Sequence, residues 1–351
     1  MRSRIRQLHL TIALVAATFV VVLGVTGSIM AFEPELDWAL HRELWDVVPL
    51  GTPLSLAELT ARVAEQYPRQ AISRFDVSSA PDMAWRVALP GALLYVNPYT
   101  GQAIGVGITT PDWLARVHQL HLRLLWMSHP DAGKAIVSWM CVALLFLVST
   151  GLYLWWPLQR FTIKWRVGGR RRWLDVHAVT GISVATFLFV LGVTGAAIGF
   201  DDMTEPFFYR VTGSAPSVPP THTVEPRPEG PIVPDRAMAI ARATLPGATP
   251  FQITIPKPDG TYLVRLRYPE DRTPGGRSRV EVDQYTGDVI FAEGSRTAPA
   301  GTRAVILNRA LHTGDILGMP TKILMSLASL LTVVMATSGV LTWWHRRRAR
   351  R

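Results

Sequence analysis

Histidine is the residue type in this sequence whose spacing most suggests chemistry. Nine histidines occur, and four of them recur at matching places in two halves of the chain, His9 with His177 and His121 with His312. Neutral imidazole is the commonest metal ligand among side chains, and it also exchanges protons near neutral pH. One interpretation of this spacing is a functional role such as metal binding. The plainer alternative is unrelated polar rings, which a duplicated sequence would also inherit in pairs.

A fifth histidine, His118, is a weaker candidate. It lies three residues before His121 and shares roughly one face of a helix with it. The second half has Asn308 or Arg309 at the corresponding place, so His118 lacks a copy. We expect His118 to be a hydrogen-bonding neighbour of the site or a contact for the substrate. The remaining histidines are expected to be solvated, structural or interfacial residues: His41, His129, His222 and His345.

Four apolar stretches are long enough to hold such residues in a membrane. A spanning helix needs about 20 mostly apolar residues, and residues 10–32, 135–156, 176–200 and 322–344 qualify without a charge in their central parts. A cleaved signal peptide is the alternative for the first stretch, but its apolar run is too long for one. The sequence predicts a membrane α-helical protein with four transmembrane helices.

The positive charge of the chain indicates its orientation. The formal net charge is +10, but segments 1–9, 157–175 and 345–351 hold 14 of the 36 Lys and Arg residues. The rest has more acidic than basic residues, which argues against nucleic acid as a partner. Basic residues mark the cytoplasmic side of a membrane, so both termini are expected inside. Four tryptophans would lie in the cytoplasmic aromatic belt: Trp155, Trp156, Trp343 and Trp344.

The chain reads as a duplication. Gly-Val-Thr-Gly begins 15 residues after both His9 and His177, Tyr-Thr-Gly occurs at 99–101 and 285–287, and Leu-His occurs at 120–121 and 311–312. The second and fourth spans each contain Ser/Thr-Gly and end in Trp-Trp. Each unit is a span, an outside segment and a span. Both units enter from the same side, so the repeats are parallel.

Each outside segment is expected to hold a small α+β domain. Ser55 and Glu58 fit a capping box that opens a helix, and Asp235 is expected to cap the corresponding helix in the second segment. Four strand-like runs follow each helix. The last two runs are joined by the Tyr-Thr-Gly turns, and a proline-rich loop at 214–234 precedes the second domain. Short amphipathic stretches at 113–126 and 304–317 carry His121 and His312.

The predicted organisation follows from these boundaries. It consists of the N-terminus and first span at 1–32, a periplasmic domain at 33–133, the second span at 134–156, a basic cytoplasmic loop at 157–175, the third span at 176–200, a second periplasmic domain at 201–320, the fourth span at 321–344 and a basic tail at 345–351.

Several common chemistries are excluded. The single cysteine, Cys141, rules out a disulfide framework and Cys-only zinc or iron–sulfur sites. The sequence has no Cys-x-x-Cys-His for covalent haem and no Gly-x-Gly-x-x-Gly after a strand for a flavin or nicotinamide nucleotide. It also has no hydrolase motif, and we assign no catalytic residue.

These features together resemble the PepSY-associated transmembrane helix (PepSY-TM) family over nearly the whole chain. The motifs that carry the resemblance are the Tyr-Thr-Gly turns, the paired Leu-His, the spans that begin with His9 and His177, and the terminal Ser/Thr-Gly with Trp-Trp. Characterised relatives include inner-membrane, haem-containing reductases of ferric siderophores, and activities within the family are diverse.

The resemblance implies two haem b groups. Two facing imidazoles are the axial ligands that a low-spin b-type haem needs, so His9 and His177 are expected to hold one iron and His121 and His312 the other. Glycines would leave room for the macrocycle, although close helix packing is an equal alternative. The glycines expected at the haems are Gly24, Gly27, Gly151, Gly192, Gly195 and Gly339.

The function that the resemblance implies is reduction of a ferric siderophore at the periplasmic face of a bacterial inner membrane during iron uptake. The electron donor would be an external cytoplasmic or membrane partner, because the chain has no flavin or nucleotide motif. The alternative is a non-enzymatic PepSY binding or regulatory module, anchored in the lipid bilayer and without haem.

Overall fold

The computed structural model describes residues 1–107, 112–273 and 275–349, so Arg350 and Arg351 of the predicted basic tail lie outside the described residues. The chain forms two compact units. The first unit is helical and comprises Met1–Glu33, Trp113–Phe208 and Ala304–Arg351. The second comprises Pro34–Asp112 and Tyr209–Arg303. The chain therefore leaves the helical unit and returns to it twice.

Four long helices in the first unit are long and apolar enough to cross a membrane, as the sequence predicts. Each extends beyond its apolar centre, because backbone hydrogen bonding continues through the flanking polar residues. The fourth helix, for example, includes His345 and Arg346–Arg348. Their bounds are α1 Arg2–Ala31, α6 Pro130–Trp155, α7 Arg170–Gly199 and α11 Met319–Arg348.

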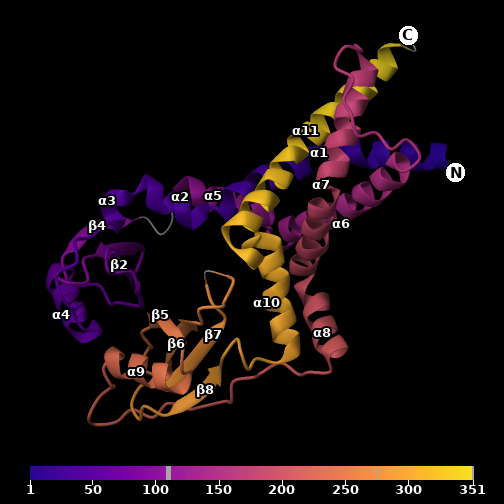
Figure 1. The fold of residues 1–351 in the computed structure, drawn as a ribbon. Helices are drawn as coiled ribbons and strands as arrows, with labels where there is room; N and C mark the ends of the chain where they lie inside the picture. Colours follow the sequence, from indigo (N-terminus) through magenta and orange to yellow (C-terminus); the bar gives the residue numbers. More distant parts are fainter. Residues whose placement is uncertain (108–111, 274, 350–351) are drawn as a thin grey trace. The chain divides into compact units, whose positions relative to one another are not determined.

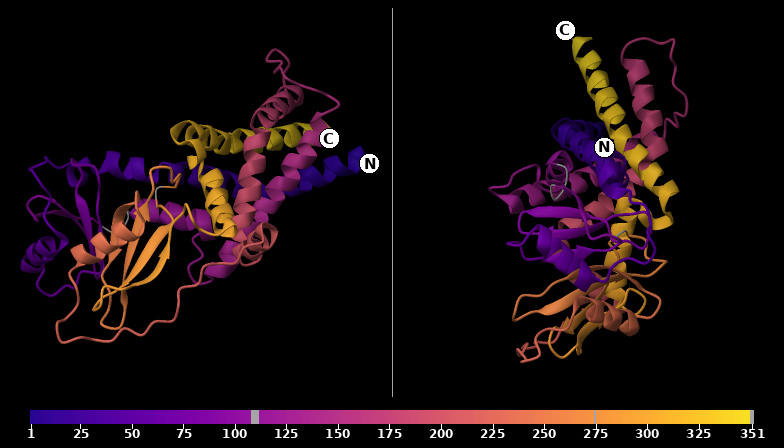
Figure 2. Two further views of the ribbon diagram at one scale, coloured as in Figure 1. Left: turned by 60° about the horizontal axis from the view of Figure 1, so that its bottom comes forward. Right: turned by 90° about the vertical axis from the view of Figure 1, so that its left-hand side faces the viewer.

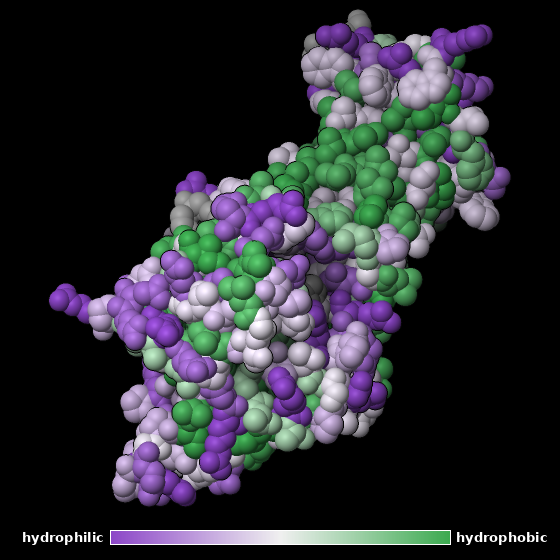
Figure 3. Space-filling model, turned by 60° about the vertical axis from the view of Figure 1, so that its left-hand side comes forward, coloured by the Kyte–Doolittle hydropathy of each residue, from purple (hydrophilic) through white to green (hydrophobic). Residues whose placement is uncertain are grey.

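These helices form one packed bundle. Helix α7 packs against α6 and α11, and α1 packs against the same two helices. The basic ends of the four helices lie toward the same side of this unit as two pairs, α1 with α6 and α7 with α11 (Figure 1). In the first pair, Arg2 donates to the Leu154 carbonyl oxygen at 2.9 Å. Large apolar side chains such as Trp139, Phe189 and Leu327 remain exposed. Figure 3 shows an extended hydrophobic surface on one face of the molecule, and such a surface suits contact with lipid.

Shorter helices connect the long ones to the second unit. The predicted amphipathic stretches form α5 (Asp112–Arg123) and α10 (Ala300–Thr313), and the latter is followed by a 3₁₀ turn at Asp315–Leu317. The remaining short helices are α2 Glu33–Leu40, α3 Arg42–Trp45 and α8 Asp201–Thr212.

The second unit contains one antiparallel sheet with eight strands in the order β4-β3-β2-β1-β5-β6-β7-β8 (Figures 1 and 2). Strands from the two outside segments meet where Phe75 of β1 pairs with Ile253 of β5. This pairing satisfies two strand edges that would otherwise be open. The strands are β1 Arg74–Asp76, β2 Trp85–Leu89, β3 Ala92–Val96, β4 Ala103–Gly107, β5 Thr249–Thr254, β6 Thr261–Arg267, β7 Ser278–Asp283 and β8 Val289–Glu293.

Helices α4 (Leu56–Gln66) and α9 (Pro234–Thr244) pack on this sheet through one hydrophobic core. The core joins both outside segments, because it includes buried Leu59 and Phe75 from the first and Ile253 from the second.

The prediction that Asp235 caps α9 is wrong. Val233 is its N-cap residue, without a side-chain bond. The Asp235 carboxylate instead accepts hydrogen bonds from the Leu56 and Ala57 N–H groups at 2.7 and 2.8 Å. It therefore stabilises the start of α4, where helix N–H groups lack intrahelical partners. The capping box of Ser55 and Glu58 on α4 is confirmed.

The two Tyr-Thr-Gly turns are built in the same way. Asn97 Oδ1 accepts from the N–H groups of the next Tyr and Thr, and Asp283 Oδ1 does so in the second turn. Both turns end on a glycine with positive φ, +73° at Gly101 and +78° at Gly287. Only glycine adopts this conformation without strain, which explains the repeated motif.

Candidate functional site: two histidine pairs

The structure brings the four repeated histidines together in the two combinations expected. His9 of α1 and His177 of α7 have ring centroids 6.4 Å apart, with their planes at 88°. His121 of α5 and His312 of α10 have centroids 6.5 Å apart, with their planes at 57°. Two imidazoles that share one metal ion from opposite sides have centroids about 6 Å apart, because a metal–nitrogen bond is about 2 Å long. Both pairs have the separation that a shared metal requires.

The two pairs lie at different levels of the helical unit. Helix α1 carries His9 and, 17 residues later, Thr26, which contacts His121. Helix α7 repeats this arrangement with His177 and Thr194, which contacts His312. This separation corresponds to about 25 Å along a helix axis. The hydrocarbon core of a bilayer is about 30 Å thick, so one pair lies toward each end of the spans.

Each histidine ring rests against a Ser/Thr-Gly dipeptide of another helix. The hydroxyl residue contacts Nδ1 of the ring, and the glycine leaves space for the ring edge at Cε1. The four rings and their dipeptides are His9 with Thr150-Gly151, His177 with Ser338-Gly339, His121 with Thr26-Gly27, and His312 with Thr194-Gly195. Sequence reasoning missed these hydroxyls, although a Ser or Thr precedes the glycine in all four motifs.

The ring nitrogens are held by short contacts. Nδ1 lies 2.8 Å from Thr150 Oγ1 in His9 and 2.9 Å from the threonine Oγ1 in both His121 and His312. His177 Nδ1 lies 3.0 Å from the Met335 carbonyl oxygen and 3.3 Å from Ser338 Oγ. All of these contacts involve Nδ1, so Nε2 is the nitrogen of each ring that can bind a metal.

The expected glycines divide into two groups. A Cβ atom added at Gly27 or Gly195 would lie 2.9 or 3.0 Å from the Cε1 atom of the neighbouring histidine, and one at Gly151 or Gly339 would lie 3.5 or 3.4 Å from it. The other two glycines serve helix packing. A Cβ at Gly24 would collide with Thr332 and Ser329 of α11, and one at Gly192 would lie 2.8 Å from Leu145 Cδ2 of α6.

The His121–His312 pair is neutral under ordinary conditions. Burial lowers the pKa of His121 to about 4, with a smaller effect of His118 in the same direction. Burial likewise lowers the pKa of His312 to about 4, assisted by His121 and Arg309. Neutral imidazole keeps a lone pair on one nitrogen, which is the form that binds metals.

His118 has a different environment. Its Nδ1 lies 3.3 Å from Glu33 Oε2, and 41% of its side chain is exposed. The structure therefore places His118 beside the His121–His312 pair as a partner of Glu33. Of the other histidines, His41 bonds Asp37 and His222 bonds Asp283.

The donor set limits the kind of metal group that fits. Within residues 1–107, 112–273 and 275–349, no group of three or more His, Cys, Asp or Glu side chains could hold a metal ion. Two imidazoles alone do not complete a structural or catalytic zinc site, which needs three or four protein ligands. A haem supplies its own equatorial nitrogens and needs only axial ligands. Each pair fits that requirement.

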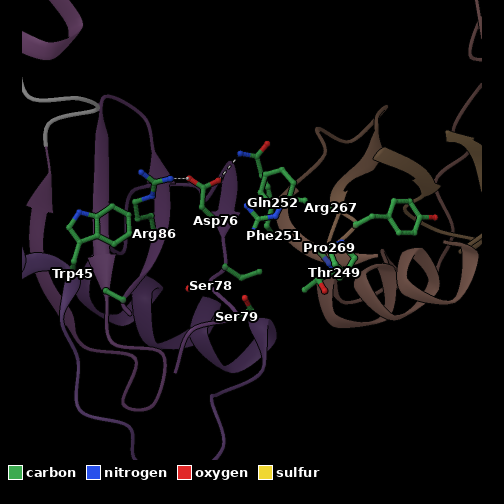
Figure 4. Close-up of a pocket in the computed structure, with 14 residues that line it drawn as sticks. Trp45, Asp76, Ser78, Ser79, Arg86, Thr249, Phe251, Gln252, Arg267 and Pro269 are labelled. Atoms are coloured by element: carbon green, nitrogen blue, oxygen red, sulfur yellow. Dashed lines mark hydrogen bonds and ion pairs between the residues drawn. The ribbon is translucent and has the colours of Figure 1, made fainter. Parts of the chain in front are cut away.

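A cleft of about 290 Å³ lies in the second unit, where β1 and β5 meet (Figure 4). Asp76 at this junction is bonded to Arg86 of β2 at 3.3 Å and to Gln252 of β5 at 2.7 Å. The Arg86 guanidinium lies 5.0 Å from the centre of the Trp45 ring. Arg267 and Phe251 line the other side. The cleft offers cationic and aromatic groups to a ligand.

Comparison with known proteins identifies the family. No curated protein matches the chain. A family model, the PepSY-associated TM region, matches residues 6–346. With its four candidate membrane helices and separate antiparallel sheet, the chain belongs to this family of membrane proteins.

Proposed function

We propose that this protein is an electron-transfer protein of the bacterial inner membrane that holds two b-type haems and reduces a ferric siderophore, or another ferric chelate, at the periplasmic face. The observation that carries the proposal is the presence of two histidine pairs, each with the ring separation of a shared metal and with Nδ1 already engaged.

The residues of the chain divide the work. His9 and His177 would ligate one iron, and His121 and His312 the other, each through Nε2. The Ser/Thr-Gly dipeptides orient the rings, and the four spans exclude water. A bound haem supplies one-electron redox chemistry at each site. A single site near one membrane face could not carry an electron across the whole membrane. Two sites about 25 Å apart along α1 and α7 divide the crossing into shorter steps.

The orientation follows from the basic residues. Arg2, the loop at 157–175 and the end of α11 are expected in the cytoplasm, which places the His9–His177 pair toward the donor. The His121–His312 pair and the second unit then face the periplasm. The donor is a cytoplasmic or membrane partner.

Reduction releases iron because oxygen donors of a siderophore are hard ligands and bind Fe(III) better than Fe(II). One electron converts Fe(III) to Fe(II), and the chelate loosens. The cleft at the β1–β5 junction contains Arg86 and Arg267 and one carboxylate, Asp76, so its charged side chains leave a net positive charge that favours an anionic, oxygen-rich chelate.

The proposal is tested by following the electron. The purified protein is reduced anaerobically, ferric siderophore is added, and haem reoxidation is recorded together with capture of Fe(II) by a chelator. We expect the parent to reoxidise and release Fe(II). We expect His312→Ala to lose both, while the other haem remains reducible by dithionite.

His118→Ala is the matched control, because His118 lies beside the same pair and bonds Glu33, and its effect should be milder. Reoxidation of His312→Ala as fast as the parent contradicts the proposed path. Absence of haem from the parent favours the alternative, a PepSY binding or regulatory module.

A further inference from the structure

The hydroxyl beside each histidine has only one proton, and it is already used. Thr26 and Thr194 donate to the carbonyl oxygens of Val22 and Val190, each four residues earlier on the same helix and each at 2.7 Å. The two hydroxyls of the His9–His177 pair do the same at 2.6 Å, from Thr150 to Phe146 and from Ser338 to Val334. Such bonds are common for Ser and Thr within helices.

The direction of the histidine contacts follows from this count. A hydroxyl that has donated its proton can only accept at its oxygen. The short contacts from Nδ1 to these oxygens therefore require a proton on Nδ1. His177 gives independent support, because its nearer partner is the Met335 carbonyl oxygen at 3.0 Å, and a carbonyl oxygen only accepts.

The position of the proton decides which nitrogen can bind a metal. A neutral imidazole has one N–H and one lone pair, so a proton on Nδ1 leaves the lone pair on Nε2. Partners on the second ring nitrogen fix the tautomer and ring orientation of metal-binding histidines and raise their basicity. In this protein the same partner type occurs four times, on four different helices.

We propose that Thr26, Thr150, Thr194 and Ser338 are positioning residues that hold all four histidines in the Nδ1–H tautomer and present Nε2 to a shared metal group in each pair. The glycine after each hydroxyl residue completes the arrangement, because it lets the ring edge approach the helix closely enough for the Nδ1 bond. The identity of the metal group as haem rests on the proposed function; the tautomer does not.

The four positions differ in a way that the test can use. Thr26, Thr150 and Thr194 supply the nearest oxygen to their rings, so removal of the hydroxyl takes the closest acceptor from the buried Nδ1–H. The backbone at Leu23 and Leu191 gives His121 and His312 a second, weaker partner. His177 also has the Met335 carbonyl oxygen, which no side-chain substitution removes. Loss of the Ser338 hydroxyl should therefore have the smallest effect of the four.

The test compares Thr194→Val, which keeps the shape of the side chain and removes its oxygen, with Thr194→Ser, which keeps the hydroxyl. Nitrogen-15 chemical shifts of labelled histidine in detergent-solubilised, haem-free protein report the tautomer of His312 directly. Titration with haem reports affinity. We expect the parent and Thr194→Ser to show the Nδ1–H form. We expect Thr194→Val to show a tautomer mixture and about tenfold to a hundredfold weaker haem binding at the His121–His312 pair.

Thr332→Val is the matched control. Thr332 is buried on a membrane helix and donates to the Ser329 carbonyl oxygen, as the four positioning residues donate to theirs, but it bonds no imidazole among the described residues. It should change neither readout. An Nε2–H tautomer in the haem-free parent, or an unchanged tautomer and affinity in Thr194→Val, overturns the inference. If the parent binds no haem, the proposed function fails, and the nitrogen shifts still decide the tautomer.

Discussion

The two histidine pairs share a ring separation but differ in how their ligands are carried. His9 and His177 both belong to membrane helices, and their Ser/Thr-Gly dipeptides lie on the other two membrane helices. His121 and His312 belong to the short helices α5 and α10, and only their dipeptides lie on the spans α1 and α7. The first pair is built by the bundle alone, whereas the second depends on short helices docked against it.

The two pairs also differ in how closely each histidine ring approaches its glycine. The short helices approach Gly27 and Gly195 so tightly that a Cβ would lie about 3 Å from the ring carbon, while the spans leave 3.4 to 3.5 Å at Gly339 and Gly151. A short helix buries little surface, so its packing alone holds a histidine ring weakly. The close contact with the glycine and the hydrogen bond with the threonine therefore fix the position of the ring. The His121–His312 pair is therefore expected to be more sensitive to substitution.

The largest effect should come from the ligands themselves. We expect His9→Ala with His177→Ala to remove one haem, and to be little worse than either single change, because both act on one site. The double variant His9→Ala with His312→Ala removes one ligand from each pair, and we expect it to lose both haems. Haem content per chain measures this. Equal losses in the two double variants would disprove the pairing.

The second largest effect should come from substitution of the glycines, which we expect to affect haem binding differently at the two pairs. Overfilling a packed site costs about 1 to 3 kcal/mol, so we expect Gly27→Ala, whose added methyl group would meet the His121 ring at 2.9 Å, to weaken haem binding at the His121–His312 pair by about tenfold or more. Gly339→Ala adds the same methyl group against His177 at ordinary contact distance and should change binding less than threefold. Haem titration of both proteins tests this, and a larger effect in Gly339→Ala would reverse the comparison.

A smaller difference is expected inside the His9–His177 pair. Thr150→Val removes the oxygen partner of His9, whereas Ser338→Ala leaves His177 its bond to the Met335 carbonyl oxygen. The midpoint potential of this haem, measured by spectroelectrochemistry, should rise more in Thr150→Val, because the ring that lost its acceptor becomes a weaker electron donor. Equal shifts would mean that the carbonyl oxygen does not hold His177.

A change in the second unit should leave both pairs unaltered. Asp283→Asn keeps the turn, as Asn97 does in the first segment, but removes the ion pair of Asp283 with His222 at 2.6 Å. Burial opposes ionisation of Asp283, but the bonds from His222 and the turn N–H groups lower its pKa below the ordinary value. The resulting stability is present above that ordinary value and is lost as the pH falls through the lowered pKa.

We therefore expect Asp283→Asn to cost about 1 kcal/mol of stability near neutral pH and less in acid, while the haem spectra stay unchanged. Thermal unfolding at several pH values, followed by circular dichroism, measures the first effect. A shift in either haem band would show that the pairs depend on this turn.

The sequence was informative where residues act locally or repeat. Apolar length predicted the four spans, and Ser55 with Glu58 predicted the start of α4. The repeated histidines predicted which rings lie together. Apart from these repeated histidines, the sequence did not reveal contacts between distant segments. Asp235 was assigned to its own helix because a cap looks local, yet it bonds the start of α4, 178 residues away from Ala57.

The same limit applies to the candidate site. Six glycines looked equivalent in the sequence, but their neighbours lie on other helices, and only the structure separates the four at the rings from Gly24 and Gly192. The hydroxyl residues were visible in every motif, but their role required the ring nitrogen and the helix carbonyl oxygen together. Pairing of β1 with β5 likewise joins segments that the sequence leaves apart.

The account is tested most directly by counting haem in the purified protein and recording its low-temperature electron paramagnetic resonance spectrum. We predict two b-type haems per chain, both low-spin with two histidine ligands. We predict two distinct ferric signals, because the ring planes stand at 88° in one pair and 57° in the other. A protein that is fully folded and contains no haem, or that contains haem in a high-spin form which His9→Ala and His312→Ala leave unchanged, would contradict the account.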